Sequence, residues 1–71
     1  MSPEEIILKE LENFNSRYNE PAFARQIIAF DPKTNSCYTS QQTAYYLTKL
    51  VKKGKIERIP TEKDAYRYII K

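Results

Sequence analysis

The sequence has no histidine and no tryptophan, and only one cysteine and one glycine, in 71 residues. Without histidine, the commonest general base and metal ligand is missing, and the single thiol of Cys37 makes neither an internal disulfide nor a zinc site. One glycine leaves no glycine-rich loop that would hold a phosphate group. We therefore expect no enzyme, no metal site, no cofactor and no small-molecule substrate.

Long apolar runs are also missing from the sequence. No stretch approaches the roughly 18 to 20 consecutive apolar residues that a membrane-spanning helix needs. The sequence begins Met-Ser-Pro-Glu-Glu, which is acidic, whereas a secretory signal begins with basic residues and continues with apolar ones. We expect a cytoplasmic protein with no membrane partner. The length suits one domain over residues 1–71, and 41% hydrophobic with 30% charged residues is typical of a globular chain.

Charge is distributed unevenly along the chain. The net charge of +3 divides into −2 for residues 1–35, with four basic and six acidic residues, and +5 for residues 36–71, with eight basic and three acidic residues. A basic region of this kind attracts polyanions. The second half is therefore where we expect a polyanion to bind.

Capping signals and apolar spacing predict two helices in the first half. Ser2, Pro3 and Glu5 form a capping box with proline in the first turn, and apolar residues at helical spacing extend the helix to about residue 15. Its remaining apolar residues, Ile6, Leu8 and Phe14, either complete the core or form a dimer contact. Pro21 predicts the start of a second helix over 21–30, with the apolar residues Phe23, Ile27 and Phe30 at helical spacing.

A third helix is predicted over residues 39–53, after a polar loop at 31–38. Thr39 and Gln42 form a second capping box, and Gly54 is placed to end the helix in the left-handed conformation. Its buried side is predicted to consist of Thr43, Leu47, Leu50 and Val51. After Gly54, residues 55–59 and 65–70 are rich in strand formers on either side of a turn at 60–64. The predicted fold class is α+β, mainly α, with three helices followed by a two-stranded β-hairpin.

The run from Thr39 to Arg58 resembles the recognition helix and the start of the wing in winged helix-turn-helix DNA-binding proteins. Together with the hairpin, the resemblance covers about residues 39–71. Within that family, the Thr-x-x-Gln-x-x-Tyr-Tyr-Leu run and the C-terminal segment are most similar to small bacterial pilus-operon regulators of the PapI and FaeA type. The resemblance implies a single winged helix-turn-helix domain, with the helix at 39–53 in the major groove and the wing at 55–70 on the DNA backbone or minor groove.

The residues of the third helix suggest the same function independently. With the apolar side turned inward, the outward side is polar and basic, and glutamine pairs with adenine while lysine pairs with guanine in the major groove. The predicted base contacts are Ser40, Gln41, Gln42, Tyr45 and Lys49. The predicted phosphate contacts are Tyr46, Lys52, Lys53, Arg58, Lys63 and Arg67.

These residues leave two functions open. The first is a sequence-specific regulator of transcription that binds double-stranded DNA. One module of 71 residues makes few phosphate contacts, so this regulator is expected to act as a homodimer or beside a larger co-regulator protein. The alternative is a protein–protein adaptor that does not bind DNA and presents Tyr45, Tyr46 and the lysine face to an acidic partner.

Overall fold

Helix α1 (Pro3–Tyr18) begins as the sequence predicts but is longer. The computed structural model describes residues 2–61, 63 and 65–71. Ser2 Oγ accepts a hydrogen bond from the Glu5 backbone N–H at 3.3 Å, which confirms the predicted capping box. The predicted end near residue 15 is wrong, because α1 continues to Tyr18, and the next residue, Asn19, closes the helix at φ 53°. Asn15 lies inside the helix, and its side chain forms hydrogen bonds with residues outside α1.

The predicted second helix does not form. Residues 21–30 contain strand β1 (Ala22–Phe23), the three-residue 3₁₀ helix η1 (Ala24–Gln26) and the start of strand β2 (Phe30–Asp31). Ala22 is buried opposite Tyr68 of a distant strand. Burial then alternates along the next residues, with 27 and 29 buried and 28 and 30 exposed, as expected for an extended chain. Pairing with a distant strand therefore overrides the helical spacing.

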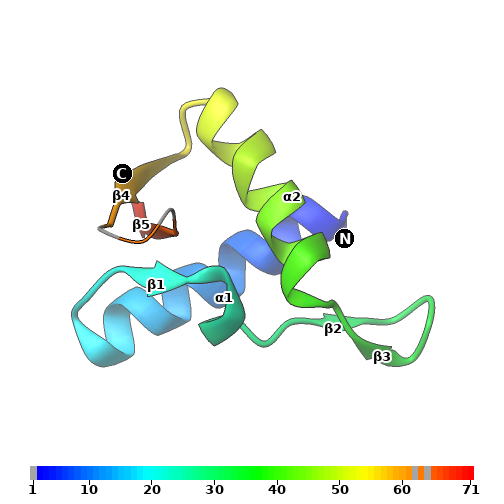
Figure 1. Cartoon of the computed structure of the whole chain (residues 1–71). Helices are drawn as coiled ribbons and strands as arrows, with labels where there is room; N and C mark the ends of the chain where they lie inside the picture. The colour runs from blue at the N-terminus through cyan, green and yellow to red at the C-terminus, as the bar shows by residue number, and fades with distance from the viewer. Residues whose placement is uncertain (1, 62, 64) are drawn as a thin grey trace.

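The predicted fold class is wrong for this reason. The described residues form two α-helices and five strands in two antiparallel sheets, rather than three helices and a two-stranded hairpin. The polar loop at 31–38 is also a small hairpin, in which β2 pairs with β3 (Ser36–Cys37). Asp31 accepts a hydrogen bond from the Lys33 N–H at 2.9 Å, and Asn35 adopts φ 58°, so the turn forms as its residue types predict. Figure 1 shows this hairpin extending away from the rest of the chain, beside the start of helix α2.

Helix α2 (Ser40–Lys52) confirms the helix predicted over 39–53, with one residue fewer at each end. Thr39 Oγ1 accepts from the Gln42 N–H at 3.1 Å, and Gln42 Oε1 accepts from the Thr39 N–H at 3.0 Å. At the other end, the Gly54 N–H donates to the Val51 carbonyl at 3.0 Å, and Gly54 adopts φ 75°. The glycine ends the helix in the left-handed conformation, as predicted.

The predicted C-terminal hairpin is also present. Strands β4 (Ile56–Pro60) and β5 (Tyr66–Ile70) are antiparallel, with Ile56 opposite Ile70. β1 adds to β5, so the sheet has three strands in the order β1-β5-β4. Of the turn predicted at 60–64, residues 62 and 64 lie outside the described residues.

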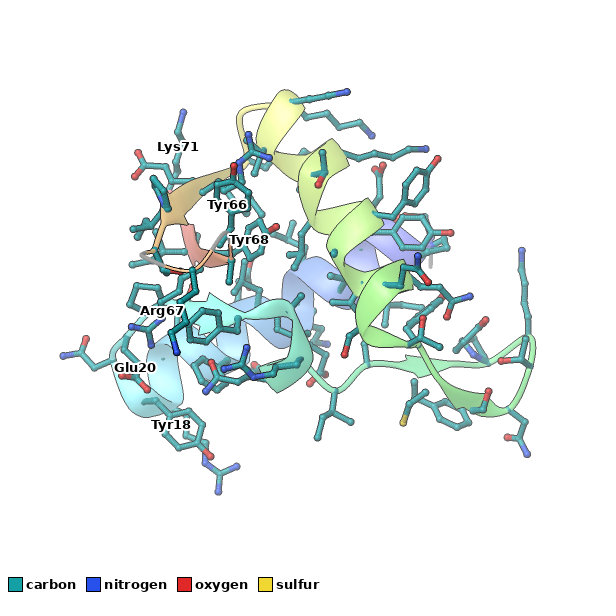
Figure 2. The ribbon with its side chains drawn as sticks, in the orientation of Figure 1. Tyr18, Glu20, Tyr66, Arg67, Tyr68 and Lys71 are labelled. Atoms are coloured by element: carbon teal, nitrogen blue, oxygen red, sulfur yellow. The ribbon has the colours of Figure 1, made fainter. Side chains whose placement is uncertain are left out.

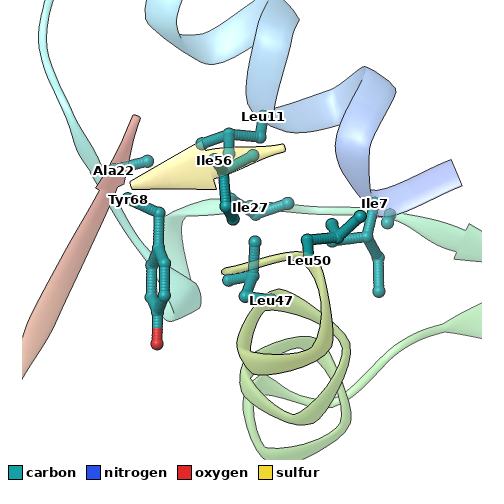
Figure 3. Close-up of a cluster of buried hydrophobic side chains, with 9 residues drawn as sticks. Ile7, Leu11, Ala22, Ile27, Leu47, Leu50, Ile56 and Tyr68 are labelled. Atoms are coloured by element: carbon teal, nitrogen blue, oxygen red, sulfur yellow. The ribbon is translucent and has the colours of Figure 1, made fainter. Parts of the chain in front are cut away.

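The core lies where α1, α2 and the three-stranded sheet meet (Figure 3). Its largest fully buried side chains are Ile7, Leu11, Thr43, Leu47, Leu50 and Ile56. Three of the inward residues predicted for α2 are buried, whereas Val51 is only half-buried. The apolar residues left open on α1, Ile6, Leu8 and Phe14, are half-buried and pack against this core. Among the described residues, no helix is long and apolar enough to cross a membrane.

Candidate nucleic-acid interface

The outward face of α2 carries the predicted base contacts. Because Thr43, Leu47 and Leu50 are buried, side chains about half a turn away point to solvent, and Gln41 and Tyr45 are exposed there. Lys49 and Lys52 continue the same stripe toward the helix end, and residues 40–52 include no aspartate or glutamate. We call Gln41, Tyr45, Lys49 and Lys52 the α2 stripe. This stripe is polar and aromatic in its first half and basic in its second half.

Tyr45 and Lys49 form a pair in the middle of the α2 stripe. The tyrosine is 56% exposed, and the Lys49 ammonium lies 4.7 Å from its ring centroid. Hydrogen bonding to Tyr45 raises the pKa of Lys49. The Lys49 cation and the Tyr45 ring therefore contact each other on the exposed surface of α2.

The remaining predicted base contacts differ in their availability. The Gln42 side-chain oxygen accepts one hydrogen bond in the capping box, which fixes the side chain toward Thr39 and leaves one lone pair of that oxygen and the amide N–H groups unused there. Ser40 is exposed in the first turn of α2. Tyr46, a predicted phosphate contact, is half-buried between two other rings, with centroids 5.2 Å from Tyr45 and 5.9 Å from Tyr38. The Tyr46 ring therefore has a role in packing α2 against its neighbours.

Two of the predicted phosphate contacts are already occupied by other groups. Lys53 forms an ion pair with Glu4, which joins the end of α2 to the start of α1. Arg67 donates to the Pro21 carbonyl at 2.9 Å and lies 3.6 Å from the Glu20 carboxylate. Figure 2 shows Arg67 on the side of the hairpin toward Glu20. We therefore leave both cations out of the candidate site.

The three other basic residues among the predicted phosphate contacts lie on α2 and the β4–β5 hairpin. Within residues 2–61, 63 and 65–71, no ion pair involves Lys52, Arg58 or Lys63, and all three are exposed. The Arg58 guanidinium lies 4.3 Å from the Tyr66 ring centroid on the neighbouring strand. These three cations, one from α2 and two from the β4–β5 hairpin, are the candidate phosphate contacts.

A shallow groove separates the hairpin from the first turns of α2. Its lining includes Tyr66 and Tyr68 from β5, Ser40 and Ala44 from α2, and Arg25 from η1, and its volume is about 310 Å³. Burial raises the pKa of Tyr68.

The composition and spacing of the sequence give no signal for Arg25 as a site residue. Its guanidinium lies 4.3 Å from the Phe23 ring centroid, so it is ordered by the same kind of contact as Arg58. The signal that identifies Arg25 is tertiary, because η1 lies across the groove from α2.

Among the described residues, no group of three or more histidine, cysteine, aspartate or glutamate side chains is placed to hold a metal ion. Cys37 is an exposed free thiol on the β2–β3 hairpin. Comparisons with protein-family models, curated proteins and solved structures give no match to this chain.

Proposed function

We propose that this chain binds double-stranded DNA in a sequence-specific manner and regulates transcription, with α2 in the major groove and the β4–β5 hairpin on the DNA backbone. The observation that carries the proposal is the α2 stripe: four exposed polar, aromatic and basic side chains on a helix that has no acidic residue. An α-helix with its side chains is about 10–12 Å across, and the major groove is about 12 Å wide. A helix of this diameter is therefore narrow enough to enter the major groove with the stripe toward the bases.

The chemistry of the stripe suits base recognition. The Gln41 amide has a donor and an acceptor that match adenine N7 and N6, and Lys49 is a donor to guanine O6 and N7. Tyr45 offers an apolar ring edge for a thymine methyl group and a hydroxyl for a phosphate. The flanking cations Lys52, Arg58 and Lys63 then fix the position of α2 on the duplex, because phosphate contacts set position while base contacts set sequence preference.

The test is a binding titration by fluorescence anisotropy with a random-sequence duplex of about 25 base pairs over a series of salt concentrations. We expect wild-type affinity to fall steeply as salt rises. The slope of log K against log salt is negative, and Lys52→Ala should make it less steep by about 0.9, the value for one lost phosphate contact.

Lys9→Ala is the matched control, because it removes the same charge from an exposed position on α1, outside the α2 stripe. It should leave the slope unchanged. Absence of binding at low salt would contradict the proposal, and so would an equal change of slope in the two variants.

A further inference from the structure

A second surface of the molecule lies on α1, outside the candidate nucleic-acid interface. It is a groove between α1 and the segment after η1, and we call it the α1 groove. Two apolar side chains at this groove are strongly exposed: Tyr18 at 54% and Ile28 at 71%. Phe14 lies between them and the core, with its ring centroid 4.6 Å from that of Tyr18. Adjacent exposed apolar side chains of this kind often mark a protein contact.

Charged residues of opposite sign lie at the two ends of the α1 groove. Glu10 and Arg17 both line it, and they are seven residues apart, which is two helical turns along one face. Within the described part of the chain, neither residue forms an ion pair. Phe14 lies between them on the same face. The pattern along α1 is therefore acidic, apolar and basic.

When a second α1 runs in the opposite direction, its order along the contact is basic, apolar and acidic, so opposite charges face each other. If two α1 helices pack antiparallel about a twofold axis between residues 13 and 14, residue 10 of one copy lies opposite residue 17 of the other. Glu10 then meets Arg17 twice, once on each side of the axis, as in any isologous contact. The same register places Phe14 of each copy next to the axis, opposite residue 13 of the other copy.

We infer that the occupant of the α1 groove is a second copy of this chain, packed antiparallel through α1 with paired Glu10 and Arg17. The inference does not depend on the proposed function, because none of its residues belongs to the α2 stripe or the hairpin. The contact joins like surfaces and so closes at two copies.

Charge reversal tests the pairing in analytical ultracentrifugation of the full chain. Wild type should dimerise reversibly as its concentration rises over about a hundredfold range. Glu10→Arg and Arg17→Glu should each weaken the dimer roughly tenfold, because each replaces two attractive pairs by two repulsive ones. An equimolar mixture of the two variants should regain wild-type association as a heterodimer, since each reversed charge then meets its opposite. The double variant Glu10→Arg/Arg17→Glu should also dimerise.

Glu12→Arg is the matched control, because residue 12 is exposed on α1 and does not line the groove. It should leave the dimer unchanged. Ile28→Lys should lower association without unfolding the chain, as checked by circular dichroism, because residue 28 is already exposed. A wild type that is monomeric throughout the concentration range would overturn the inference. Single variants that dimerise as well as wild type, or a mixture that does not recover association, would overturn it too.

Discussion

Lys49 and Tyr45 contact each other on the exposed surface of α2. The ammonium lies 4.7 Å from the ring centroid, which is within the range of a cation–π interaction. Arg58 over Tyr66 and Arg25 over Phe23 show the same arrangement at 4.3 Å. Cations held over aromatic rings therefore recur on α2, on the hairpin and on η1, which together surround the groove.

Gly54 ends α2 at φ 75°, and a Cβ added there would meet no atom within 4 Å. The cost of a side chain at this position is therefore conformational rather than steric. Gly54→Ala should lower the free energy of unfolding by about 1–2 kcal/mol, the cost of the left-handed conformation for a residue with a Cβ. Gly54→Asn should lose less, because asparagine tolerates this conformation better. Urea unfolding of the two variants checks the order, and equal stability of alanine variant and wild type would contradict it.

At the scale of elements, Asn15 joins α1 to the sheet. Its Nδ2 donates to the Glu20 carbonyl at 2.9 Å, and its Oδ1 accepts from the Ile70 N–H of β5 at 3.0 Å. Asn15→Ala should lower the free energy of unfolding by about 1–3 kcal/mol, because a partly buried backbone N–H loses its partner. Ser16→Ala is the control, since it removes a polar side chain from an exposed position of the same helix outside the α1 groove. If urea unfolding shows the same stability for both variants, Asn15 has no such linking role.

The elements predicted correctly are those with local signals. The start of α1, nearly all of α2 and the β4–β5 hairpin follow from capping boxes, Gly54 and β-branched runs, all of which act within a few residues. The segment 21–30 was mispredicted because its structure depends on β5, and Ala22 pairs with a residue 46 positions later. Helical spacing of apolar residues carries no information about such a partner.

The same division applies to the candidate site. The residues of the α2 stripe could be predicted, because helical periodicity alone determines which side chains point away from a buried face. Lys53 pairs with Glu4, and Arg67 contacts residues 20–21, and in each case the two partners are distant in sequence. The sequence does not reveal such partners. The charge of Lys53 and Arg67 and their positions near α2 and the hairpin therefore predicted phosphate contacts for them. The position of Arg25 at the groove is likewise tertiary.

At the scale of the whole molecule, the Glu4–Lys53 ion pair connects the two helices, and its contribution to stability depends on pH. The hydrogen bond from Lys53 lowers the pKa of Glu4 below its ordinary value of 4.5. A carboxylate with a lowered pKa in the folded state stabilises the protein above its unfolded pKa, and this stabilisation is lost as the pH falls through the folded value. Glu4→Gln should therefore have a lower melting temperature than wild type at neutral pH, and this difference should shrink in acid below pH 4.5. A difference that stays constant with pH would contradict this role for the pair.

The most direct test of the proposed DNA interface is an NMR titration of ¹⁵N-labelled protein with a duplex, followed by the amide chemical shifts. We predict that the largest changes fall on the exposed residues of α2 between Gln41 and Lys52 and on the β4–β5 hairpin around Arg58, with little change on the outer side of α1. Changes concentrated on α1, with α2 unaffected, would contradict the account.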